Sequence, residues 1–325
     1  MDQIGWGIIG CGAVTEVKSG LAFNKIEGSK LVAVMRRDGQ KAEDYARRHG
    51  VPKWYDDADK LINDPEVNAV YIATPPNSHA EYTIRAAQAG KCVYVEKPMA
   101  RNFDECRIMI DACEKANVPL FVAYYRRRLP DFAKVKQLID AGAIGPVRFV
   151  CIELYHQPTE EVFDPQRLPW RVLPEIAGGG YFFDLASHQL DFLDYAFGPI
   201  ASAKGFAANQ AGLYPAEDVV CASFTFESGA VGSGVWCFTV SAENRKDCTQ
   251  VVGEKGKITY SSFDPAPVVL ETALGVEQFN IARPQHVQQP LIQTVVDELR
   301  GRGKCPSTGL SAARTSRVMD WITGC

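Results

Sequence analysis

The sequence predicts an α/β domain with a parallel sheet, followed by an α+β domain whose open sheet is mostly antiparallel. Over about the first 120 residues, short apolar runs alternate with stretches of helical spacing. After Ala123 the pattern changes to apolar runs that follow one another closely, with turn residues between them. The length of 325 residues is enough for two hydrophobic cores. We therefore predict one domain over residues 1–123 and a second over residues 124–325.

The first half is organised as strand–helix units. Short apolar runs predict strands at Trp6–Ile9, Leu31–Met35, Ala69–Ala73, Cys92–Val95 and Pro119–Ala123. The helical stretches between them are one that ends near Ala22, then Lys41–His49, His79–Ala89 and Phe103–Ala116. Gly50 and Gly90 are typical helix stop signals. Such alternation with short connections indicates a parallel sheet that has helices on both faces.

The second half contains strands that succeed one another directly. A helix at Phe132–Ala141 and a strand at Val147–Tyr155 lead into a long loop from Pro158 to Gly180. A helix at Tyr181–Phe197 is then followed by strands at Ser202–Asn209, Val219–Phe226, Ala230–Thr239, Thr249–Gly253, Lys257–Ser261 and Val268–Glu271. This succession is typical of a mostly antiparallel sheet. A terminal helix over Leu310–Ile322 is a candidate to pack on the first domain.

Composition and charge exclude several classes of partner. The formal net charge of -4 argues against nucleic acid and against an anionic membrane, because both call for a basic face. No apolar run reaches the roughly 18 residues of a membrane span, and the first strand begins too early for a signal peptide. Ten cysteines are scattered through apolar segments without a CxxC pair, which is typical of reduced core thiols. We expect a cytoplasmic protein.

The turn after the first strand is the candidate phosphate-binding segment. Gly10-x-Gly12 lies between a strand and a helix, where glycines let the backbone approach a pyrophosphate and the helix amino terminus supplies N–H groups. We assign Gly10, Cys11, Gly12, Ala13 and Val14 to a dinucleotide site, and the domain to the Rossmann type. Thr15 takes the place of the third glycine of the usual fingerprint. The alternative is a glycine-rich turn without a ligand.

The residues after the second strand predict the choice of cofactor. NAD sites place an acidic residue there for the ribose 2′-hydroxyl, whereas a 2′-phosphate requires arginine. This chain has Arg36 and Arg37, and Asp38 follows them. We therefore favour NADP(H) over NAD(H). The alternative is that both arginines are solvated and that Asp38 reaches back to the ribose.

Glu96-Lys97-Pro98 follows the buried strand Cys92–Val95. The carboxyl ends of the strands are where open α/β sheets bind ligands. A lysine there brings three donors and a positive charge, and its pKa falls readily on partial desolvation, which suits proton transfer. Pro98 fixes its own φ and can hold the preceding bond cis, so that Lys97 is aimed.

Together these residues resemble the glucose–fructose oxidoreductase and inositol dehydrogenase (Gfo/Idh/MocA) family over essentially the whole chain. The markers, in order, are Gly10-Cys11-Gly12, Ala73-Thr74-Pro75-Pro76-Asn77-Ser78-His79, Glu96-Lys97-Pro98, Tyr125-Arg126-Arg127 and Gly178-Gly179-Gly180 leading to Asp184 and His188. The resemblance implies that Thr74, Pro75, Asn77 and His79 line the nicotinamide end of the cofactor site, and we also assign Glu96 and Lys97 to the cofactor site. The resemblance also implies that Lys97, Asp184 and His188 are catalytic.

Two departures from the family pattern bear on which sugar is bound. Family members commonly have Gly before the active-site histidine and an Asn-Arg-Arg version of the other motif, and this chain has Ser187 and Tyr125 instead. We assign Lys97, Tyr125, Trp170, Arg171, Asp184 and His188 to the substrate site. The alternatives are a purely structural Asp–His pair and, for the aromatic residues, packing between domains.

The pair Asp184 and His188 has the spacing that puts two residues on one helix face. A neutral histidine can accept a hydroxyl proton, and a carboxylate beside it stabilises the imidazolium that results. Apart from this pair, no histidine or cysteine pair has metal-ligand spacing. Because Lys97 would also repel a cation, we predict that the site holds no metal.

The predicted activity is hydride transfer between NADP(H) and a secondary alcohol or ketone carbon of a sugar or cyclic polyol. Two rival functions are a lyase or hydrolase that retains its cofactor and uses transient oxidation, and a non-catalytic dinucleotide sensor. One face of the second-domain sheet, with apolar residues within Val219–Phe226 and Val231–Phe238, predicts an interface. We expect a homodimer or a homotetramer through that face.

Overall fold

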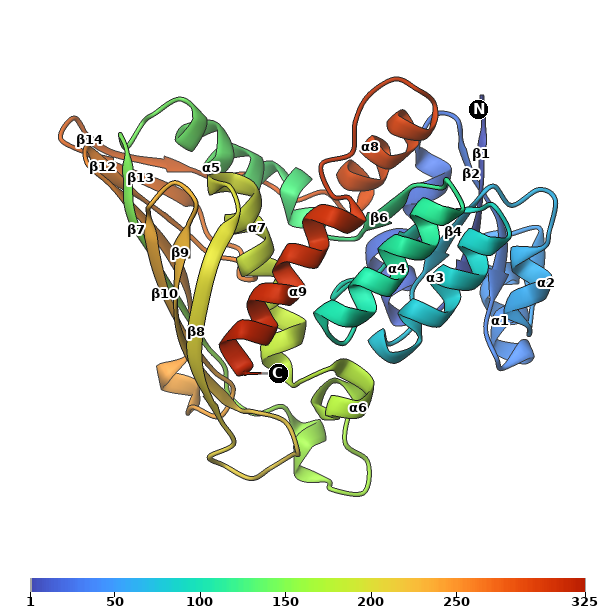
Figure 1. Cartoon of the computed structure of the whole chain (residues 1–325), viewed down its shortest axis with the longest axis horizontal. Helices are drawn as coiled ribbons and strands as arrows, with labels where there is room; N and C mark the ends of the chain where they lie inside the picture. The colour runs from blue at the N-terminus through green and yellow to red at the C-terminus, as the bar shows by residue number, and fades with distance from the viewer. Residues whose placement is uncertain (1, 325) are drawn as a thin grey trace. The chain divides into compact units, whose positions relative to one another are not determined.

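The computed structural model describes residues 2–324, which divide into two compact units (Figure 1). The first unit extends to Leu129 and resumes over Pro284–Ala313. The second unit covers Pro130–Arg283 and resumes at Arg314. The segment Pro284–Ala313, which the sequence analysis includes in residues 124–325, is thus part of the first unit. No helix within residues 2–324 combines the length and hydropathy of a membrane span.

The first unit is built on a parallel sheet with strand order β3-β2-β1-β4-β5-β6. The strands are β1 (Ile4–Ile9), β2 (Ser29–Met35), β3 (Lys53–Tyr55), β4 (Ala69–Ile72), β5 (Cys92–Val95) and β6 (Leu120–Val122). The order reverses between β1 and β4, which is the place where doubly wound sheets bind ligands. The Rossmann prediction is confirmed. Strand β3 was not predicted, because three residues at a sheet edge are too few to show a periodic pattern.

Helices flank this sheet. They are α1 (Gly39–His49), α2 (Ala58–Ile62), α3 (His79–Gln88), α4 (Phe103–Lys115) and α8 (Gln289–Leu299). The side chains of Asp38, Asp57 and Asn102 cap the amino termini of α1, α2 and α4. The segment after β1, predicted as one helix through Ala22, is a π-helical turn over Thr15–Ser19 followed by a 3₁₀ turn over Gly20–Lys25.

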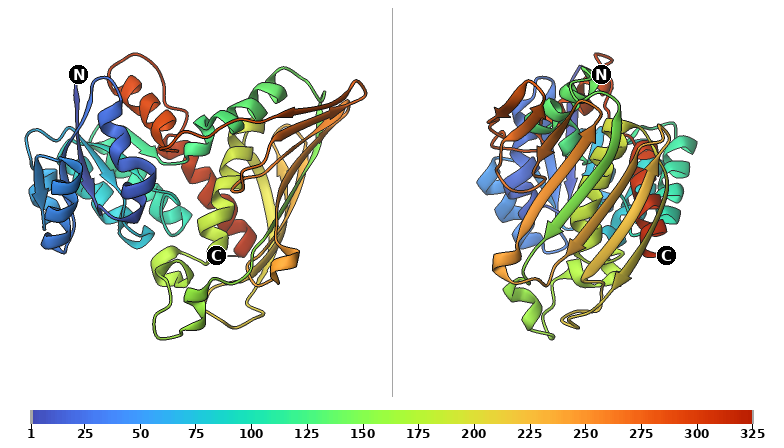
Figure 2. Two further views of the ribbon diagram at one scale, coloured as in Figure 1. Left: turned by 180° about the vertical axis from the view of Figure 1, so that it is seen from behind. Right: turned by 90° about the vertical axis from the view of Figure 1, so that its left-hand side faces the viewer.

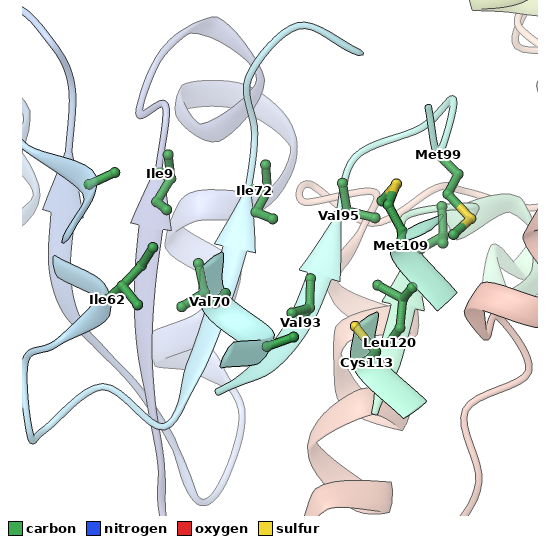
Figure 3. Close-up of a cluster of buried hydrophobic side chains, with 14 of the residues drawn as sticks. Ile9, Ile62, Val70, Ile72, Val93, Val95, Met99, Met109, Cys113 and Leu120 are labelled. Atoms are coloured by element: carbon green, nitrogen blue, oxygen red, sulfur yellow. The ribbon is translucent and has the colours of Figure 1, made fainter. Parts of the chain in front are cut away.

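The core of the first unit is packed on three strands, β1, β4 and β5, that are buried along their whole length. Figure 3 shows Ile9, Ile72 and Val95 near the ends of β1, β4 and β5, with Met109 and Cys113 of α4 beside the sheet. Burial on both faces explains why these strands are continuous apolar runs. Because the strands are parallel, their carboxyl ends meet at one edge, and this edge presents the residues that follow each strand.

The second unit contains a mostly antiparallel sheet, as predicted. Its strand order is β14-β13-β12-β11-β7-β10-β9-β8. The strands are β7 (Val147–Tyr155), β8 (Ile200–Ala208), β9 (Val219–Phe226), β10 (Val231–Cys237), β11 (Lys246–Gly253), β12 (Gly256–Tyr260), β13 (Val268–Thr272) and β14 (Gly275–Phe279). The pair β10–β7 is parallel, and the pairs on either side of it are antiparallel. Strand β14 was not predicted.

One face of this sheet is covered by helices and the other is open. The unit contains α5 (Pro130–Asp140), α6 (Pro174–Ala177), α7 (Ser187–Phe197) and the part of α9 (Gly309–Thr323) that follows Ala313. The right-hand view of Figure 2 looks onto the open face. Alternation along β7 buries Val150, Ile152 and Leu154 against the covered face.

The open face is less apolar than the apolar runs in the sequence predict. Phe224, Phe226 and Trp236, within the two segments named for an interface, are buried on the covered face, because strand side chains alternate. Val231, in the second of these segments, is exposed, and so is Phe206 on β8, which lies outside both segments and is 87% exposed. Cys221, predicted as a core thiol, is exposed for the same reason.

Candidate active site

The turn after β1 brings the backbone close to the end of β4. Gly10 has a φ of +90°, and a Cβ there would lie 2.8 Å from Thr74 Cγ2, so that no side chain fits. The Thr15 hydroxyl accepts from the N–H of Gly12 (3.0 Å) and donates to the Gly12 carbonyl (2.9 Å). Thr15 therefore closes the turn in place of a third glycine. The turn fits a dinucleotide phosphate, which needs such a close backbone approach.

The rest of this turn differs in exposure. Cys11 is buried, and burial raises the pKa of its thiol to about 11. Ala13 is exposed and Val14 is half-buried. The Cys11 carbonyl accepts from Nη1 of Arg36 at 3.4 Å, so the Arg36 guanidinium lies beside the turn.

Arg36, Arg37 and Asp38 follow β2 and are all exposed. The Asp38 carboxylate caps α1 by accepting from the N–H of Lys41 (3.3 Å), and it forms an ion pair with the Lys41 ammonium (3.1 Å). These bonds to Lys41 hold the pKa of Asp38 below its ordinary value. Asp38 is thus engaged by its own helix, and the side chain next to the turn is a guanidinium.

The segment Thr74–His79 is held to the loop after β5 by the His79 ring. Its Nε2 lies 2.8 Å from the Thr74 carbonyl, and its Nδ1 lies 3.2 Å from the carbonyls of Pro98 and Met99. Burial lowers the pKa of His79. The ring is fully buried, so its visible role is to join two loops. Asn77 is exposed and Pro75 is half-buried, which leaves both accessible.

Glu96 and Lys97 stand at the carboxyl end of β5, as predicted. The Lys97–Pro98 peptide bond is cis. The Glu96 carboxylate is buried and accepts hydrogen bonds from Tyr71 (2.5 Å) and from the N–H of Lys97 (3.2 Å). Lys97 itself is only half-buried. Glu96 is therefore occupied inside the unit, while Lys97 borders on solvent.

Tyr125 belongs to the same electrostatic environment as Lys97. Burial opposes ionisation of its hydroxyl, but the positive charges of Arg126, Lys18 and Lys97 together hold its pKa below the ordinary value. The Arg126 guanidinium lies 5.1 Å from the centre of the Tyr125 ring. Three cationic side chains therefore act on the Tyr125 hydroxyl, and the Glu96 carboxylate partly opposes them.

In the second unit, Asp184 and Arg171 are in contact. Asp184 lies in a π-helical turn over Phe182–Ala186 that leads into α7, where an ordinary helix was predicted. Nε of Arg171 lies 3.2 Å from its carboxylate, and the guanidinium stacks at 4.5 Å from the centre of the Trp170 ring. Three predicted site residues are thus brought together. Single π turns within helices occur frequently at functional sites.

His188 lies in the first turn of α7, next to an aromatic ring that was not predicted. Its ring centre lies 6.1 Å from that of Phe263, edge to face at 68°. Phe263 is part of a turn after β12 that Asp247 organises. The Asp247 carboxylate accepts from the hydroxyl of Ser261 (2.5 Å) and from the N–H groups of Phe263 (2.6 Å) and Asp264 (2.9 Å).

Glu217 is a further residue that sequence reasoning missed. Its carboxylate accepts from the N–H of Gly180 at 3.2 Å. A Cβ on Gly179 would lie 2.8 Å from the same carboxylate, and one on Gly180 would lie 2.8 Å from Ala216. The glycines before Asp184 are therefore needed for close packing against Glu217. Their run in the sequence was the available signal, but it did not name the partner.

The predicted site residues are divided between the two units. Gly10 to Val14, Arg36, Arg37, Thr74 to His79, Glu96, Lys97 and Tyr125 belong to the first, and Trp170, Arg171, Asp184 and His188 belong to the second. The first group can hold a dinucleotide and donate a hydrogen bond from an ammonium. The second group offers an imidazole and a carboxylate for proton transfer. Within residues 2–324, no three His, Cys, Asp or Glu side chains cluster as metal ligands would.

Comparisons with known proteins extend over both units. Residues 4–124 match the family model GFO_IDH_MocA, an oxidoreductase family with an NAD-binding Rossmann fold, and residues 132–259 match a GFO/IDH/MocA C-terminal domain. Oxidoreductase P35 of Formosa agariphila is 40% identical over 323 residues, which are 99% of each chain. A 1,5-anhydro-D-fructose reductase of Ensifer adhaerens is 26% identical over 94% of this chain and 90% of its own.

A solved structure shares the fold. Levoglucosan dehydrogenase, in complex with NADH and levoglucosan, has a TM-score of 0.88 at 23% identity. The match covers 98% of this chain and 96% of the other.

Proposed function

Because the chain belongs to the Gfo/Idh/MocA family of NAD-binding oxidoreductases, we propose that it is a sugar or cyclic polyol dehydrogenase or reductase. The nicotinamide C4 of the bound cofactor would accept hydride from a secondary alcohol carbon, or return it to a ketone. The observation that carries the proposal is the family match through both units, together with Lys97 at the end of β5 and Asp184 and His188 in the second unit.

Each of these three side chains has a chemical role in the proposal. The Lys97 ammonium donates a hydrogen bond to the reacting oxygen and stabilises the negative charge that develops on it. His188 removes the hydroxyl proton during oxidation and returns it during reduction. Asp184 orients the site residues and stabilises the imidazolium. Tyr125, Trp170 and Arg171 bind the substrate. The Arg171 guanidinium, stacked on Trp170, can donate hydrogen bonds to sugar hydroxyl groups, and the Trp170 ring can contact the apolar face of the sugar.

We further propose that NADP(H) is preferred over NAD(H). The engagement of Asp38 with Lys41 and the position of Arg36 beside the Cys11 carbonyl support this preference. A guanidinium pairs bidentately with a phosphate, and a 2′-phosphate at the end of β2 would meet one. Gly10, Gly12 and the segment Thr74–His79 complete the proposed cofactor site.

Homo-oligomerisation through the open face of the second-unit sheet is also part of the proposal. Phe206, Val231 and Phe149 on β8, β10 and β7 are exposed there, with 87%, 50% and 41% of their surfaces accessible. Apolar side chains gathered on one sheet face favour association with a second copy. The cytoplasmic location stays a prediction.

The stoichiometry of turnover tests the function. The protein is incubated with sugars and cyclic polyols and with NADP⁺ or NAD⁺, while substrate loss and reduced-nicotinamide absorbance are followed together. We expect one cofactor reduced for each substrate oxidised. Consumption of a glycoside with no net change in absorbance would instead indicate the lyase or hydrolase with a retained cofactor. Cofactor binding without turnover of any sugar or polyol would indicate a dinucleotide sensor.

A further inference from the structure

Glu96 is the centre of a buried hydrogen-bond network that draws on distant parts of the first unit. The Gln288 amide Nε2 donates to Glu96 Oε1 at 2.6 Å, and the Tyr71 hydroxyl donates to the same oxygen at 2.5 Å. The other carboxylate oxygen accepts from the N–H of Lys97 at 3.2 Å. Gln288 is 0% exposed and Glu96 is 6% exposed.

The outer bonds of the network fix the direction of the inner ones. The Tyr94 hydroxyl donates to Gln288 Oε1 at 3.1 Å, which leaves the amide NH₂ to face Glu96. Ser19 Oγ lies 3.0 Å from the Tyr71 hydroxyl, and because that hydroxyl donates to Glu96, Ser19 is the donor to Tyr71. Burial, followed by the charge of Glu96, raises the pKa of Tyr71, which keeps it a donor.

The network joins three segments whose relative positions the proposed mechanism depends on. Ser19 ends the π-helical turn after Gly10–Gly12, Tyr71 lies on β4, and Gln288 directly precedes α8. The backbone N–H of Gln288 also donates to the Lys18 carbonyl at 3.3 Å. Tyr71 and Gln288 connect these segments to Glu96, the residue before Lys97.

Stability alone is a weak reason for such an arrangement. Burying a carboxylate has a large desolvation cost, and replacing buried polar groups by well-packed apolar ones is often neutral or stabilising. A network in which each donor has one acceptor does fix a single geometry. At metal sites, removal of the polar groups that orient the ligands typically lowers affinity or activity by about 10–100-fold, and we expect an effect of the same order for groups that orient Lys97.

We propose that Gln288 and Tyr71 are positioning residues for Lys97 and act through Glu96. This inference rests on the proposed function, because it assumes that the Lys97 ammonium contacts the reacting oxygen. Lys97 follows Glu96 directly, so a carboxylate anchored at both oxygens fixes where the lysine side chain leaves the backbone. Loss of either donor leaves Glu96 Oε1 with one bond from the pair instead of two. The Glu96 side chain is then held less firmly and Lys97 drifts from its productive position, and misplacement by about 1 Å can lower a rate about 100-fold.

A double-mutant cycle tests the inference. Gln288→Leu and Tyr71→Phe are each made in the natural chain and in a Lys97→Met background. Gln293→Leu is the matched control, since this half-buried glutamine is on the same helix and its amide bonds Asp297 at 2.9 Å. Turnover is measured with the best substrate, and reduced-cofactor binding is measured by nicotinamide fluorescence.

In the natural background we expect either variant to lower kcat about 10–100-fold, with cofactor affinity changed less than about 3-fold. In the Lys97→Met background the same substitutions should change the residual kcat less than about 2-fold, because residues acting through one group are not additive. Gln293→Leu should change neither.

An equal loss of kcat in both backgrounds would overturn the inference and leave the proposed function intact. Unchanged kcat in the natural background would also overturn it. Full turnover in Lys97→Met alone would refute the role of Lys97 and the inference with it. Tyr71→Phe removes a single hydroxyl, so it decides the question if Gln288→Leu does not fold.

Discussion

At the scale of single residues, the charged side chains of Arg36 and Asp38, which follow β2, make different contacts. Asp38 caps α1 and pairs with Lys41, whereas the Arg36 guanidinium lies beside the turn after β1. A carboxylate that already accepts from its own helix gives up those bonds if it turns to a ribose hydroxyl. Arg36 needs no such change to meet a 2′-phosphate.

Arg36→Ala should therefore weaken NADPH binding far more than NADH binding. A charge-assisted contact to phosphate contributes about 1.5–3 kcal/mol, so the Kd for NADPH should rise about 10–100-fold. The Kd for NADH should change less than about 3-fold. Titration of nicotinamide fluorescence gives both constants, and Arg47→Ala on the far part of α1, where Arg47 pairs with Asp44, is the control. Tighter binding of NADH by the natural chain would show that Asp38 governs the pocket.

Site residues differ in how far the sequence could identify them. Lys97 and His188 lie in motifs of the family that the chain resembles, and Arg36 lies at a fixed place after a strand, so these residues could be proposed from the sequence. Gln288, by contrast, is 192 positions from its partner Glu96 in the sequence, and Phe263 is 75 positions from His188. Contacts of that kind depend on how segments pack, and no local periodicity in the sequence carries that information.

At the scale of elements, Asp247 on β11 holds the turn that presents Phe263. In addition to its other bonds, its carboxylate accepts from the N–H of Ser262 at 3.0 Å. Arg283 bonds the carbonyl of Phe263 at 3.2 Å from the other side. The turn is thus fixed by side chains, and through it the Phe263 ring is kept against His188.

Asp247→Ala should destabilise the protein by about 2–4 kcal/mol, because several backbone N–H groups lose their acceptor. Urea unfolding followed by circular dichroism measures the change. Asp44→Ala is the control. The Asp44 carboxylate forms ion pairs with Arg47 and Arg48 on the surface of its own helix, and such surface pairs contribute little to stability. This variant should unfold at an unchanged urea midpoint. An Asp247→Ala protein as stable as that control would show that the turn holds itself.

The carboxyl of Glu217, which accepts from the N–H of Gly180, makes the stability of the fold depend on pH. Burial raises the pKa of this carboxyl above its ordinary value. The folded chain then binds the proton more tightly than the unfolded chain. The contribution to stability is therefore complete below the ordinary glutamate pKa and is lost as pH rises through the folded-state pKa.

Glu217→Gln removes that charge and keeps an oxygen for the N–H of Gly180. The variant should be more stable than the natural chain at about pH 8, and the difference should shrink toward about pH 5. Thermal unfolding at the two pH values measures it. A constant difference, or a variant that is less stable at the higher pH, would show that the ionised carboxylate is stabilised by its surroundings.

Elements were predictable where their pattern was long. Strands β7 and β9 begin and end at the predicted residues. β3 and β14 are short edge strands: β3 has only three residues, and β14 is exposed along most of its length. The helix α8 was overlooked although its buried residues Leu291, Ile292, Val295 and Val296 have helical spacing. The π turns could not be foreseen, because the sequence pattern of a π turn matches that of an α-helix.

At the scale of the whole molecule, the open sheet face is the surface that we expect a second copy to cover. Strand alternation places Phe206, Cys221 and Val235 on neighbouring strands of that face. Strand β8 is also the last strand in the order, so one of its edges carries no strand partner within residues 2–324. The fold class was predictable from the order of elements. Which apolar side chains lie on this face depends on how the strands pair, and the sequence pattern alone does not determine that pairing.

The chain, with a mass of 35.8 kDa, should therefore sediment as a dimer or tetramer at micromolar concentration. Phe206→Glu places a charge in the proposed interface and should raise the dissociation constant at least about 10-fold. Leu274→Glu is the control, because Leu274 is fully exposed in the turn between β13 and β14. A natural chain that sediments only as a monomer would refute the assembly.

The central claim is that Lys97 acts on the reacting oxygen of a bound sugar or polyol while the cofactor is held mainly by other residues of the first unit. Lys97→Ala tests it most directly, with turnover measured beside reduced-cofactor binding. Removal of a positioned donor to a developing negative charge costs about 10²–10³-fold, so kcat should fall by at least about 100-fold while the Kd of the cofactor changes less than about 3-fold. Full turnover by Lys97→Ala would contradict the account.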